Sequence, residues 1–303
     1  MMLDQSEKIW ESISKLAIKL ADEAGLILYE NFRKPLSVEF KDKSGLDPVT
    51  NIDIQIQKHI RDSIKSYFPE HGFLGEEETS ATSQNKNASE FLWVVDPIDG
   101  TKNFVAGLPI YACSIGVLYK GIPYMGAMFL PWPNSTKGSV IHATKGSGTY
   151  FNDEKILLCE NPQESKSSKL VTLPGSFTNI FNPSEILKNK IGDYRMTGSI
   201  AYEMAMSALG ISQFMVSSAP SIWDVAAGTC IILESGGLVL QGVSEGKRFR
   251  IFEEFKWKNL DSFNPNNESF EKVTAYNLRK WQKPIIAGTP KVVNFTASNL
   301  RKR

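Results

Sequence analysis

The chain has 303 residues, and 42% of them are hydrophobic, which is enough for one large globular unit or two closely packed halves. Its 34 Lys and Arg residues nearly balance its 33 Asp and Glu residues, and a net charge of +1 argues against a general nucleic-acid or membrane surface. The three cysteines, Cys113, Cys159 and Cys230, are too few and too widely spaced for a disulfide framework or a cysteine metal site, so we expect them to be small hydrophobic residues of the interior.

The first half of the chain predicts two amphipathic helices and then a sheet. The N-terminus, MMLDQSEKIW, has no secretion signal, and no apolar run approaches the roughly 18 residues of a membrane span, which favours a cytoplasmic location. Apolar residues at helical spacing run through residues 5–31, and Ile56, Ile60 and Ile64 mark a second helix that ends before Pro69. Apolar runs then predict strands at GFLG, FLWVV, 112–119, 124–130, 138–144 and 148–151.

The second half alternates between strands and helices. Strands are predicted at 169–173, 194–197, 213–217, 238–240 and PIIAG, and helices at 184–190, 199–209 and 222–234. Such alternation predicts layered sheets covered by helices, in the α/β (α+β) class. Residues 246–282 are polar and aromatic with weak periodicity, and we interpret them as an insertion. We expect a surface excursion there, the alternative being a subunit interface or a substrate lid.

Four segments hold acidic residues that folding alone does not explain. They are DPVTNID, GEEE, DPIDGT and WDVAAG. Asp96 and Asp99 follow a buried strand, where sites gather in open α/β sheets, and Asp224 lies just inside a predicted helix. Carboxylates that converge in a partly buried pocket repel one another unless a cation neutralises them. Oxygen ligands without Cys or His favour Mg²⁺ over Zn²⁺.

Each acidic segment also has an ordinary interpretation when it is taken alone. Asp224 could be a helix N-terminal acid, and Asp53 a helix cap. GEEE could be an exposed turn, and the stretch from Asp96 to Asp99 a capped turn. These explanations are credible singly and poor jointly, so a common site is the better hypothesis.

The ordered set DPVTNID, GEEE, DPIDGT and WDVAAG…ESGG resembles the motif set of the inositol monophosphatase family. That family contains Mg²⁺-dependent, Li⁺-sensitive phosphomonoesterases, and the match spans residues 5–245 plus the last strand. The implied fold is a layered αβαβα sandwich. Residues 1–303 would form one unit, with a metal-site half at about 1–155 and a second half at about 156–303.

The resemblance also assigns roles to residues. It implies Mg²⁺ ligands at Glu76, Asp96, Asp99, Asp224 and the carbonyl of Ile98. Thr101 and Asp47 match the pair that orients and deprotonates a metal-activated water. Two or three Mg²⁺ ions are implied, with Mn²⁺ as a possible substitute and Li⁺ as an inhibitor. The implied assembly is a homodimer that acts on a small phosphomonoester, and no nucleic-acid partner is expected.

The substrate side is assigned in the same way. The amides of Asp99, Gly100 and Thr101 would bind phosphate, with Gly100 allowing a close approach of the backbone. The loop of Gly198, Ser199 and Ile200 aligns with the loop beside the alcohol portion of the substrate. Ser217 and Asp224 complete the predicted substrate contacts.

Ser217 departs from the family pattern. Inositol-selective members place an acidic residue seven positions before the Asp of the Trp-Asp motif, and here that position is Ser217. This leaves histidinol phosphate, 3'-phosphoadenosine 5'-phosphate and fructose bisphosphate open as alternative substrates. Other classes are a non-catalytic metal- or phosphate-binding regulator, which loss of a ligand or of Thr101 would favour, and an RNA-associated role, which the near-neutral charge opposes.

Overall fold

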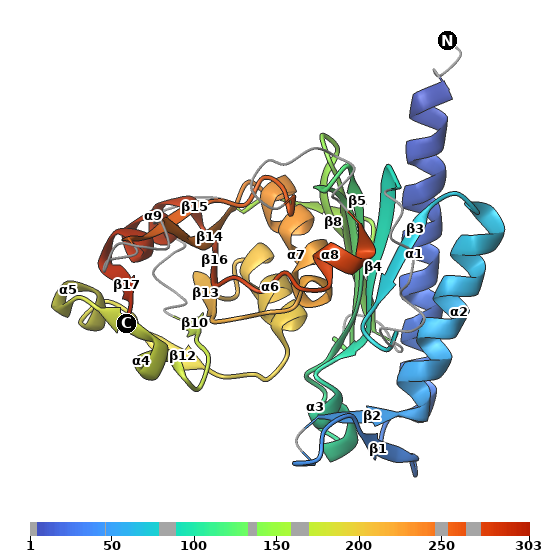
Figure 1. Ribbon diagram of the computed structural model, residues 1–303, viewed down its shortest axis with the longest axis horizontal. Helices are drawn as coiled ribbons and strands as arrows, with labels where there is room; N and C mark the ends of the chain where they lie inside the picture. Colours follow the sequence, from blue (N-terminus) through green and yellow to red (C-terminus); the bar gives the residue numbers. More distant parts are fainter. Residues whose placement is uncertain are drawn as a thin grey trace.

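Helices and sheets form five alternating layers in the molecule. The computed structural model describes residues 5–45, 47–78, 89–132, 138–158, 170–245, 254–264 and 274–303. One outer layer holds α1 (Gln5–Asn31) and α2 (Asn51–Tyr67) (Figure 1). The apolar stripe of α2 includes Ile56, Ile60 and Ile64, all fully buried, which explains why this helix packs flat on the neighbouring sheet. Both helices were predicted, and both are confirmed.

The next layer is a seven-stranded sheet in sequence order, from β3 to β9. Only β3 and β4 run parallel, and the other neighbouring strands are antiparallel. Its strands are β3 (Gly72–Gly75), β4 (Phe91–Asp99), β5 (Ala112–Tyr119), β6 (Ile122–Leu130), β7 (Ser139–Thr144), β8 (Gly148–Phe151) and β9 (Glu154–Ile156).

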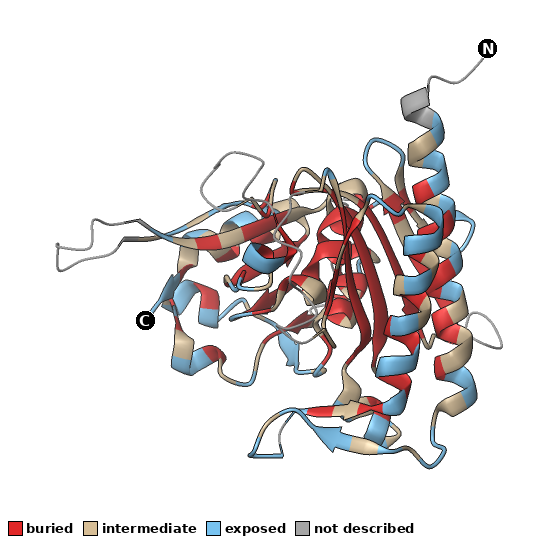
Figure 2. Cartoon of the chain, turned by 45° about the vertical axis from the view of Figure 1, so that its right-hand side comes forward, coloured by how far each residue is buried: buried red, intermediate tan, exposed pale blue. Residues whose placement is uncertain are grey.

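Two helices, α6 (Ile200–Ala208) and α7 (Ile222–Glu234), separate this sheet from a second one. The second sheet has the order β12-β10-β13-β16-β14-β15. Its strands are β10 (Leu170–Thr172), β12 (Asp193–Arg195), β13 (Phe214–Ser217), β14 (Leu238–Glu245), β15 (Glu254–Asn259) and β16 (Ile285–Gly288). Figure 2 shows that buried positions concentrate in the seven-stranded sheet and in the helices behind it.

The last layer covers the far face of the second sheet. It contains α4 (Phe177–Ile180), α5 (Glu185–Lys188), α9 (Pro290–Asn299) and the pair β11 (Phe181–Pro183) and β17 (Leu300–Lys302). Four smaller elements lie near the first sheet. They are β1 (Val38–Phe40), β2 (Pro48–Thr50), α3 (Thr101–Ala106) and α8 (Ala275–Leu278), and β1 pairs with β2. The predicted αβαβα sandwich is therefore confirmed.

The predicted surface excursion at residues 246–282 is wrong for the parts that the structure describes. Strand β15 extends the second sheet beside β14, and Leu260, Phe263 and Trp281 are buried in the central core. Aromatic side chains in this stretch therefore fill the interior, where their large apolar area is stabilising. Residues 246–253 and 265–273 lie outside the described residues.

Two simpler expectations concern cysteines and membrane spans. Cys113 and Cys230 are buried and free, as predicted, whereas Cys159 lies outside the described residues. Among the helices that the structure describes, none has both the length and the apolar character of a membrane span.

Candidate active site

Strand β4 brings two carboxylates to one side of the sheet. Asp96 lies opposite Ser114 and Asp99 opposite Ala112, so three steps along β4 match two along β5. In a regular strand, residues three apart project to opposite faces of the sheet. The extra residue in β4 forms a bulge, which lets Asp96 and Asp99 point to the same face. Pro97 has no N–H to donate to the ladder, and the amide of Ile98 donates to Asp96 Oδ1 at 3.0 Å. The predicted position of both acids at the strand end is thus observed.

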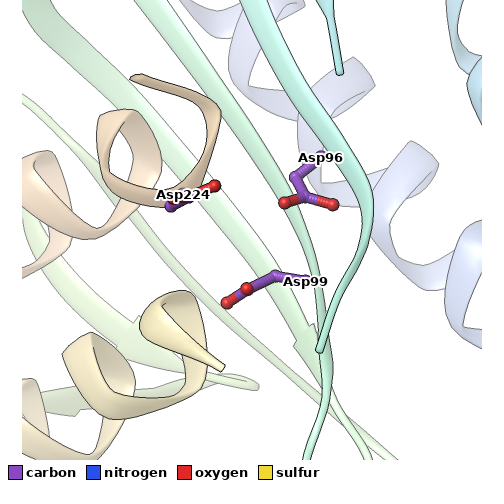
Figure 3. A group of neighbouring side chains, drawn as sticks. All are labelled: Asp96, Asp99 and Asp224. Carbon is purple, nitrogen blue, oxygen red and sulfur yellow. The ribbon is translucent and has the colours of Figure 1, made fainter. Parts of the chain in front are cut away.

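Helix α7 supplies a third carboxylate from the other half of the chain. Asp224 closes a capping box with Ser221, whose amide donates to Asp224 Oδ2 at 2.8 Å. One carboxylate oxygen from each of Asp96, Asp99 and Asp224 lies within 4.8 Å of the others (Figure 3). We call these three residues the acidic cluster.

Glycines in the sheet let α7 approach closely enough for this convergence. A Cβ atom at Gly126 would lie 2.3 Å from the carbonyl oxygen of Ala227, and one at Gly116 would lie 2.8 Å from the Ala227 amide. Both glycines therefore place the α7 backbone directly against β5 and β6. This contact fixes the height of Asp224 above β4.

Burial makes the acidic cluster electrostatically unfavourable without a cation. Burial raises the pKa of Asp96 well above its usual range, and repulsion from Glu76, Asp99 and Asp224 raises it further. Burial raises the pKa of Asp99 to about 7, although hydrogen bonds from Ser199 and Ala201 oppose that rise. Burial and the charges of Asp99 and Glu76 likewise raise the pKa of Asp224. Because all the donors are carboxylate oxygens, the residues present fit a hard divalent cation such as Mg²⁺.

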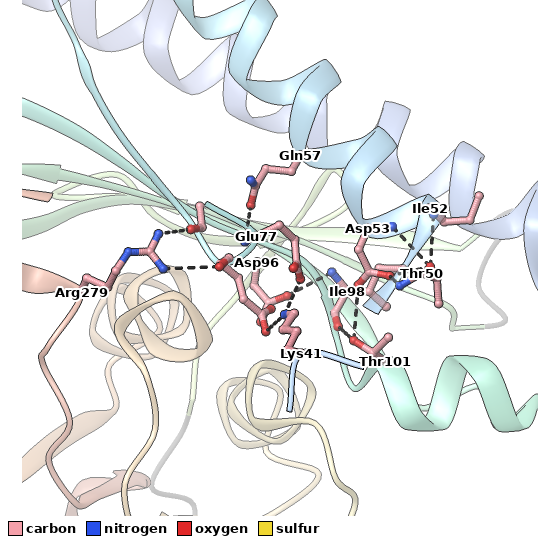
Figure 4. A network of polar contacts seen from close by, with 12 residues as sticks. Lys41, Thr50, Ile52, Asp53, Gln57, Glu77, Asp96, Ile98, Thr101 and Arg279 are labelled. Carbon is pink, nitrogen blue, oxygen red and sulfur yellow. Dashed lines mark hydrogen bonds and ion pairs between the residues drawn. The ribbon is translucent and has the colours of Figure 1, made fainter. Parts of the chain in front are cut away.

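The acidic turn, Gly75–Glu78, borders the cluster. The amide of Glu76 donates to the carbonyl of Val95 at 3.0 Å, and its carboxyl group lies within hydrogen-bonding reach of Asp96. The amide of Glu77 donates to Gln57 Oε1 at 2.8 Å (Figure 4). A Cβ atom on Gly75 would lie 2.3 Å from the same Gln57 oxygen, so only glycine admits this contact. The structure therefore places Glu76 beside Asp96, and its role as a Mg²⁺ ligand remains a prediction.

Lys41 also binds the acidic turn, and this contact was not predicted from the sequence. Its Nζ lies 2.8 Å from Glu76 Oε1 and 2.6 Å from Glu77 Oε1. Burial raises the pKa of Glu77 to about 7, and the neighbouring Glu76 raises it while Lys41 opposes the shift. A single lysine in a polar stretch has no distinguishing pattern, so nothing in the sequence marked it.

Thr101 faces Asp53 rather than Asp47. Its hydroxyl lies 2.9 Å from the carbonyl of Ile98 and 3.3 Å from Asp53 Oδ1 (Figure 4). Asp47 is exposed, its amide donates to Asp42 Oδ1 at 3.0 Å, and its carbonyl accepts from the amide of Lys41 at 2.8 Å. The pairing of Thr101 with Asp47 is therefore corrected to a pairing with the other acid of DPVTNID.

Asp53 combines this contact with the helix-cap role considered for it. Its Oδ2 accepts from the amide of Thr50 at 2.8 Å and from the Thr50 hydroxyl at 2.5 Å, which completes a capping box. Its Oδ1 is the atom that faces Thr101. Burial raises the pKa of Asp53 to about 6, against the effect of the Thr50 hydrogen bonds. The fully buried carboxylate of Asp53 thus caps the N-terminus of α2 with one oxygen and contacts Thr101 of the candidate site with the other.

The loop of Gly198, Ser199 and Ile200 also reaches the cluster. The hydroxyl of Ser199 donates to Asp99 Oδ2 at 2.8 Å, and the amide of Ala201 donates to the same oxygen. Gly100 has φ +92°, and a Cβ there would lie 3.0 Å from both Ser199 Cβ and the carbonyl oxygen of Ile110, while its predicted close approach to phosphate remains a prediction.

Ser217, which was predicted to contact the substrate, lies in the second sheet. It is the last residue of β13, it is buried, and it pairs with Ile285 of β16. Its role at a substrate thus remains a prediction.

Comparisons with known proteins agree with this geometry. A family model described as the inositol monophosphatase family matches residues 9–278. The fructose-1,6-bisphosphatase/inositol-1-monophosphatase of Aquifex aeolicus is 30% identical over 238 residues, which cover 76% of this chain and 85% of that protein. Inositol monophosphatase 1 of Homo sapiens is 29% identical over 237 residues, which cover 76% of this chain and 84% of that protein. The crystal structure of extragenic suppressor protein suhB from Bartonella henselae has a similar fold, with a TM-score of 0.69 at 22% identity over 95% of this chain and 98% of that chain.

Proposed function

This chain belongs to the inositol monophosphatase family and is therefore a phosphoric monoester hydrolase, and we propose that its reaction requires Mg²⁺ held by the acidic cluster and Glu76. The convergence of Asp96, Asp99 and Asp224 within 4.8 Å is the observation that carries this proposal. The carbonyl of Ile98 would add a further oxygen ligand. We expect two or three ions, with Mn²⁺ as a substitute and Li⁺ as an inhibitor.

The chain's own residues account for the proton transfer. Bound Mg²⁺ would lower the pKa of water, offset the charge of the phosphoryl oxygens and stabilise the departing alkoxide. The Thr101 hydroxyl has Asp53 and the Ile98 carbonyl as acceptors for its hydrogen, so its lone pairs are free to accept from a water. Because the pKa of Asp53 is about 6, its carboxylate is mostly ionised at pH 7.5 and can act as a base.

Water forms a bond to phosphorus while it passes a proton to Thr101 Oγ1, and Thr101 passes its own proton to Asp53 Oδ1. The ester P–O bond breaks, and the alkoxide takes a proton from solvent. The amides of Asp99, Gly100 and Thr101 are proposed to bind the phosphoryl oxygens during this step.

The proposed substrate is a small, inositol-phosphate-like phosphomonoester, and we expect the enzyme either to cleave inositol 1-phosphate itself poorly relative to its best substrate or to be broadly tolerant. Ser217 has no charge and a short side chain, so it cannot accept two hydroxyl hydrogen bonds as a carboxylate does. A charge-assisted hydrogen bond is typically worth about 1.5–3 kcal/mol, or roughly 10–150-fold in specificity. Fructose 1,6-bisphosphate is the second candidate, because the relative from Aquifex aeolicus carries that activity in its name.

Phosphate release from a panel of sugar, inositol, nucleotide and amino-alcohol phosphates tests these proposals. We expect hydrolysis with Mg²⁺, loss of hydrolysis in excess chelator and inhibition by Li⁺. Robust hydrolysis in excess chelator would refute the metal requirement, and a strong preference for inositol 1-phosphate would refute the argument from Ser217. A folded protein that binds Mg²⁺ but cleaves nothing would favour the non-catalytic regulator instead.

The site of action and the assembly are further expectations of this proposal. We expect a homodimer in the cytoplasm. Sedimentation equilibrium would check the homodimer, and cell fractionation would check the cytoplasmic location.

A further inference from the structure

Arg279 binds the acidic turn through the backbone of the turn. Its Nη1 donates to the carbonyl of Glu76 at 3.4 Å, and its Nη2 donates to the carbonyl of Gly75 (Figure 4). Nη2 also lies 3.9 Å from Glu78 Oε2. A planar guanidinium presents its N–H donors in a fixed geometry. Two adjacent carbonyls bound by one guanidinium are therefore fixed in both position and orientation relative to Arg279.

The same guanidinium also contacts the start of α7. Its Cζ lies 5.1 Å from the ring centroid of Trp223, which is the residue before Asp224. An Arg positioned over the face of Trp at this distance makes a favourable cation–π contact. One side chain therefore touches both the turn that carries Glu76 and the helical turn that carries Asp224.

The core anchors Arg279 on both sides in the sequence. Before it, Thr274 caps α8 by accepting from the amide of Asn277 at 3.2 Å, and Leu278 is buried. After it, the buried Trp281 packs edge-on against Phe263 with ring centroids 5.0 Å apart. Since the nearby side chains of Leu278 and Trp281 are held in the interior, Arg279 can fix the turn rather than follow it.

We propose that Arg279 is a positioning residue of the metal site, which sets the spacing between Glu76 and Asp224 by joining the acidic turn to α7. The inference rests on the proposed Mg²⁺ requirement. Lys41 and Gln57 attach the turn to the segment after β1 and to α2, whereas Arg279 attaches it to α7. Its loss should therefore loosen the relation between these two ligands while Asp96 and Asp99 keep their places on β4.

Calorimetric titration of the intact protein with Mg²⁺ tests this role without measuring turnover. The variants are Arg279→Gln and Arg279→Lys, with Lys280→Gln as the matched control. Lys280 is exposed and bonds to Tyr276, so the control removes the same charge from the next residue of the chain.

We expect Arg279→Gln to weaken Mg²⁺ binding by about tenfold or more, as for other residues that support metal ligands. Arg279→Lys should weaken it by a similar factor, because an ammonium group cannot bridge two carbonyls and stack on Trp223 together. Lys280→Gln should change it by less than about twofold, since surface charges have small effects.

The alternative is that Arg279 serves the stability of the fold alone. In that case, the Arg279 variants would melt at lower temperature but bind Mg²⁺ at 25 °C as tightly as the wild type, and this result would overturn the inference. If Arg279→Gln does not fold, Arg279→Lys decides, because it keeps the charge and the aliphatic stem. Absence of Mg²⁺ binding in the wild type would instead overturn the proposed metal requirement itself.

Discussion

Asp53→Asn replaces the carboxylate beside Thr101 by an amide of nearly the same shape. An amide cannot accept the proton that Thr101 passes on, so the expected loss is the contribution of a general base. Such groups contribute about 10²–10⁴-fold to rate. We therefore expect kcat to fall by at least about 10²-fold, with KM little changed, because Asp53 does not touch the substrate in the proposed reaction.

The stability of this variant should change much less than its rate. Because the pKa of Asp53 is raised from 3.8 to about 6 in the fold, the ionised form disfavours folding by about 3 kcal/mol above pH 6. The sign follows from the direction of the shift, since this cost is absent below about pH 4 and grows as the pH rises to 6. Asn carries no such cost, and this offsets the weaker cap that it gives to Thr50.

Steady-state phosphate release and thermal melting measure the two effects separately. Asp47→Asn is the matched control, because Asp47 lies in the same segment, is exposed and bonds to Asp42 through its backbone amide. Its kcat should stay within about twofold of the wild type. Near-normal kcat in Asp53→Asn, together with a large loss in Asp47→Asn, would refute the pairing of Thr101 with Asp53.

Three further predictions concern the cluster, the sheet and pH. Asp96→Asn should abolish turnover yet melt no lower than the wild type without Mg²⁺, because it removes buried repulsion. Gly126→Ala should lower the free energy of unfolding in denaturant by about 1–3 kcal/mol or more, since its Cβ would lie 2.3 Å from the Ala227 carbonyl. Burial lowers the pKa of His71 to about 4, and Trp93 Nε1 donates to its Nδ1 at 3.0 Å. Stability should therefore fall as the pH drops from 6.5 towards 4, and His71→Gln should flatten that slope in denaturant titrations.

Local patterns were sufficient for the elements that carry the acidic cluster. The apolar run before Asp96 predicted β4, and the Ile222–Glu234 helix was predicted with its observed bounds. Strand β4 is marked by a short continuous apolar run, and α7 by a longer apolar run with a helix start at its N-terminus. The bulge that turns Asp96 and Asp99 to one side needed the pairing with β5, which the sequence of β4 alone does not contain.

The choice between Asp47 and Asp53 depended on tertiary placement, but one signal was present. Asp53, Gln57, Ile60 and Ile64 recur at helical spacing, and all four are buried. Two polar side chains on the core-facing stripe of a helix require buried partners, which here are Thr101 and the amide of Glu77. Asp47 precedes a proline in a loop and carries no such requirement.

Arg279 had no comparable signal. Its partner Glu76 lies 203 residues away in the sequence, and hydrophobic periodicity reports only on neighbours along one element. The aromatic residues around it were misread for a related reason. Phe263 and Trp281 lie in segments without a helical or strand period, yet both fill the central core. The contribution of such an irregular segment to the core is therefore indicated by its aromatic content and not by the spacing of its apolar residues.

The arrangement of charges around the site follows from the difficulty of burying acids together. Asp99 and Asp224 raise the pKa of Asp96, and Asp99 raises the pKa of Asp224, whereas two cations of the chain, Lys41 and Arg279, contact the neighbouring turn. Had either cation paired with the cluster directly, it would have occupied the positions that a metal ion needs. Because Lys41 pairs with the carboxylate of Glu76 itself, an ion that arrives from solution would compete with Lys41 for that carboxylate, and its largest electrostatic gain would come from relieving the repulsion among Asp96, Asp99 and Asp224.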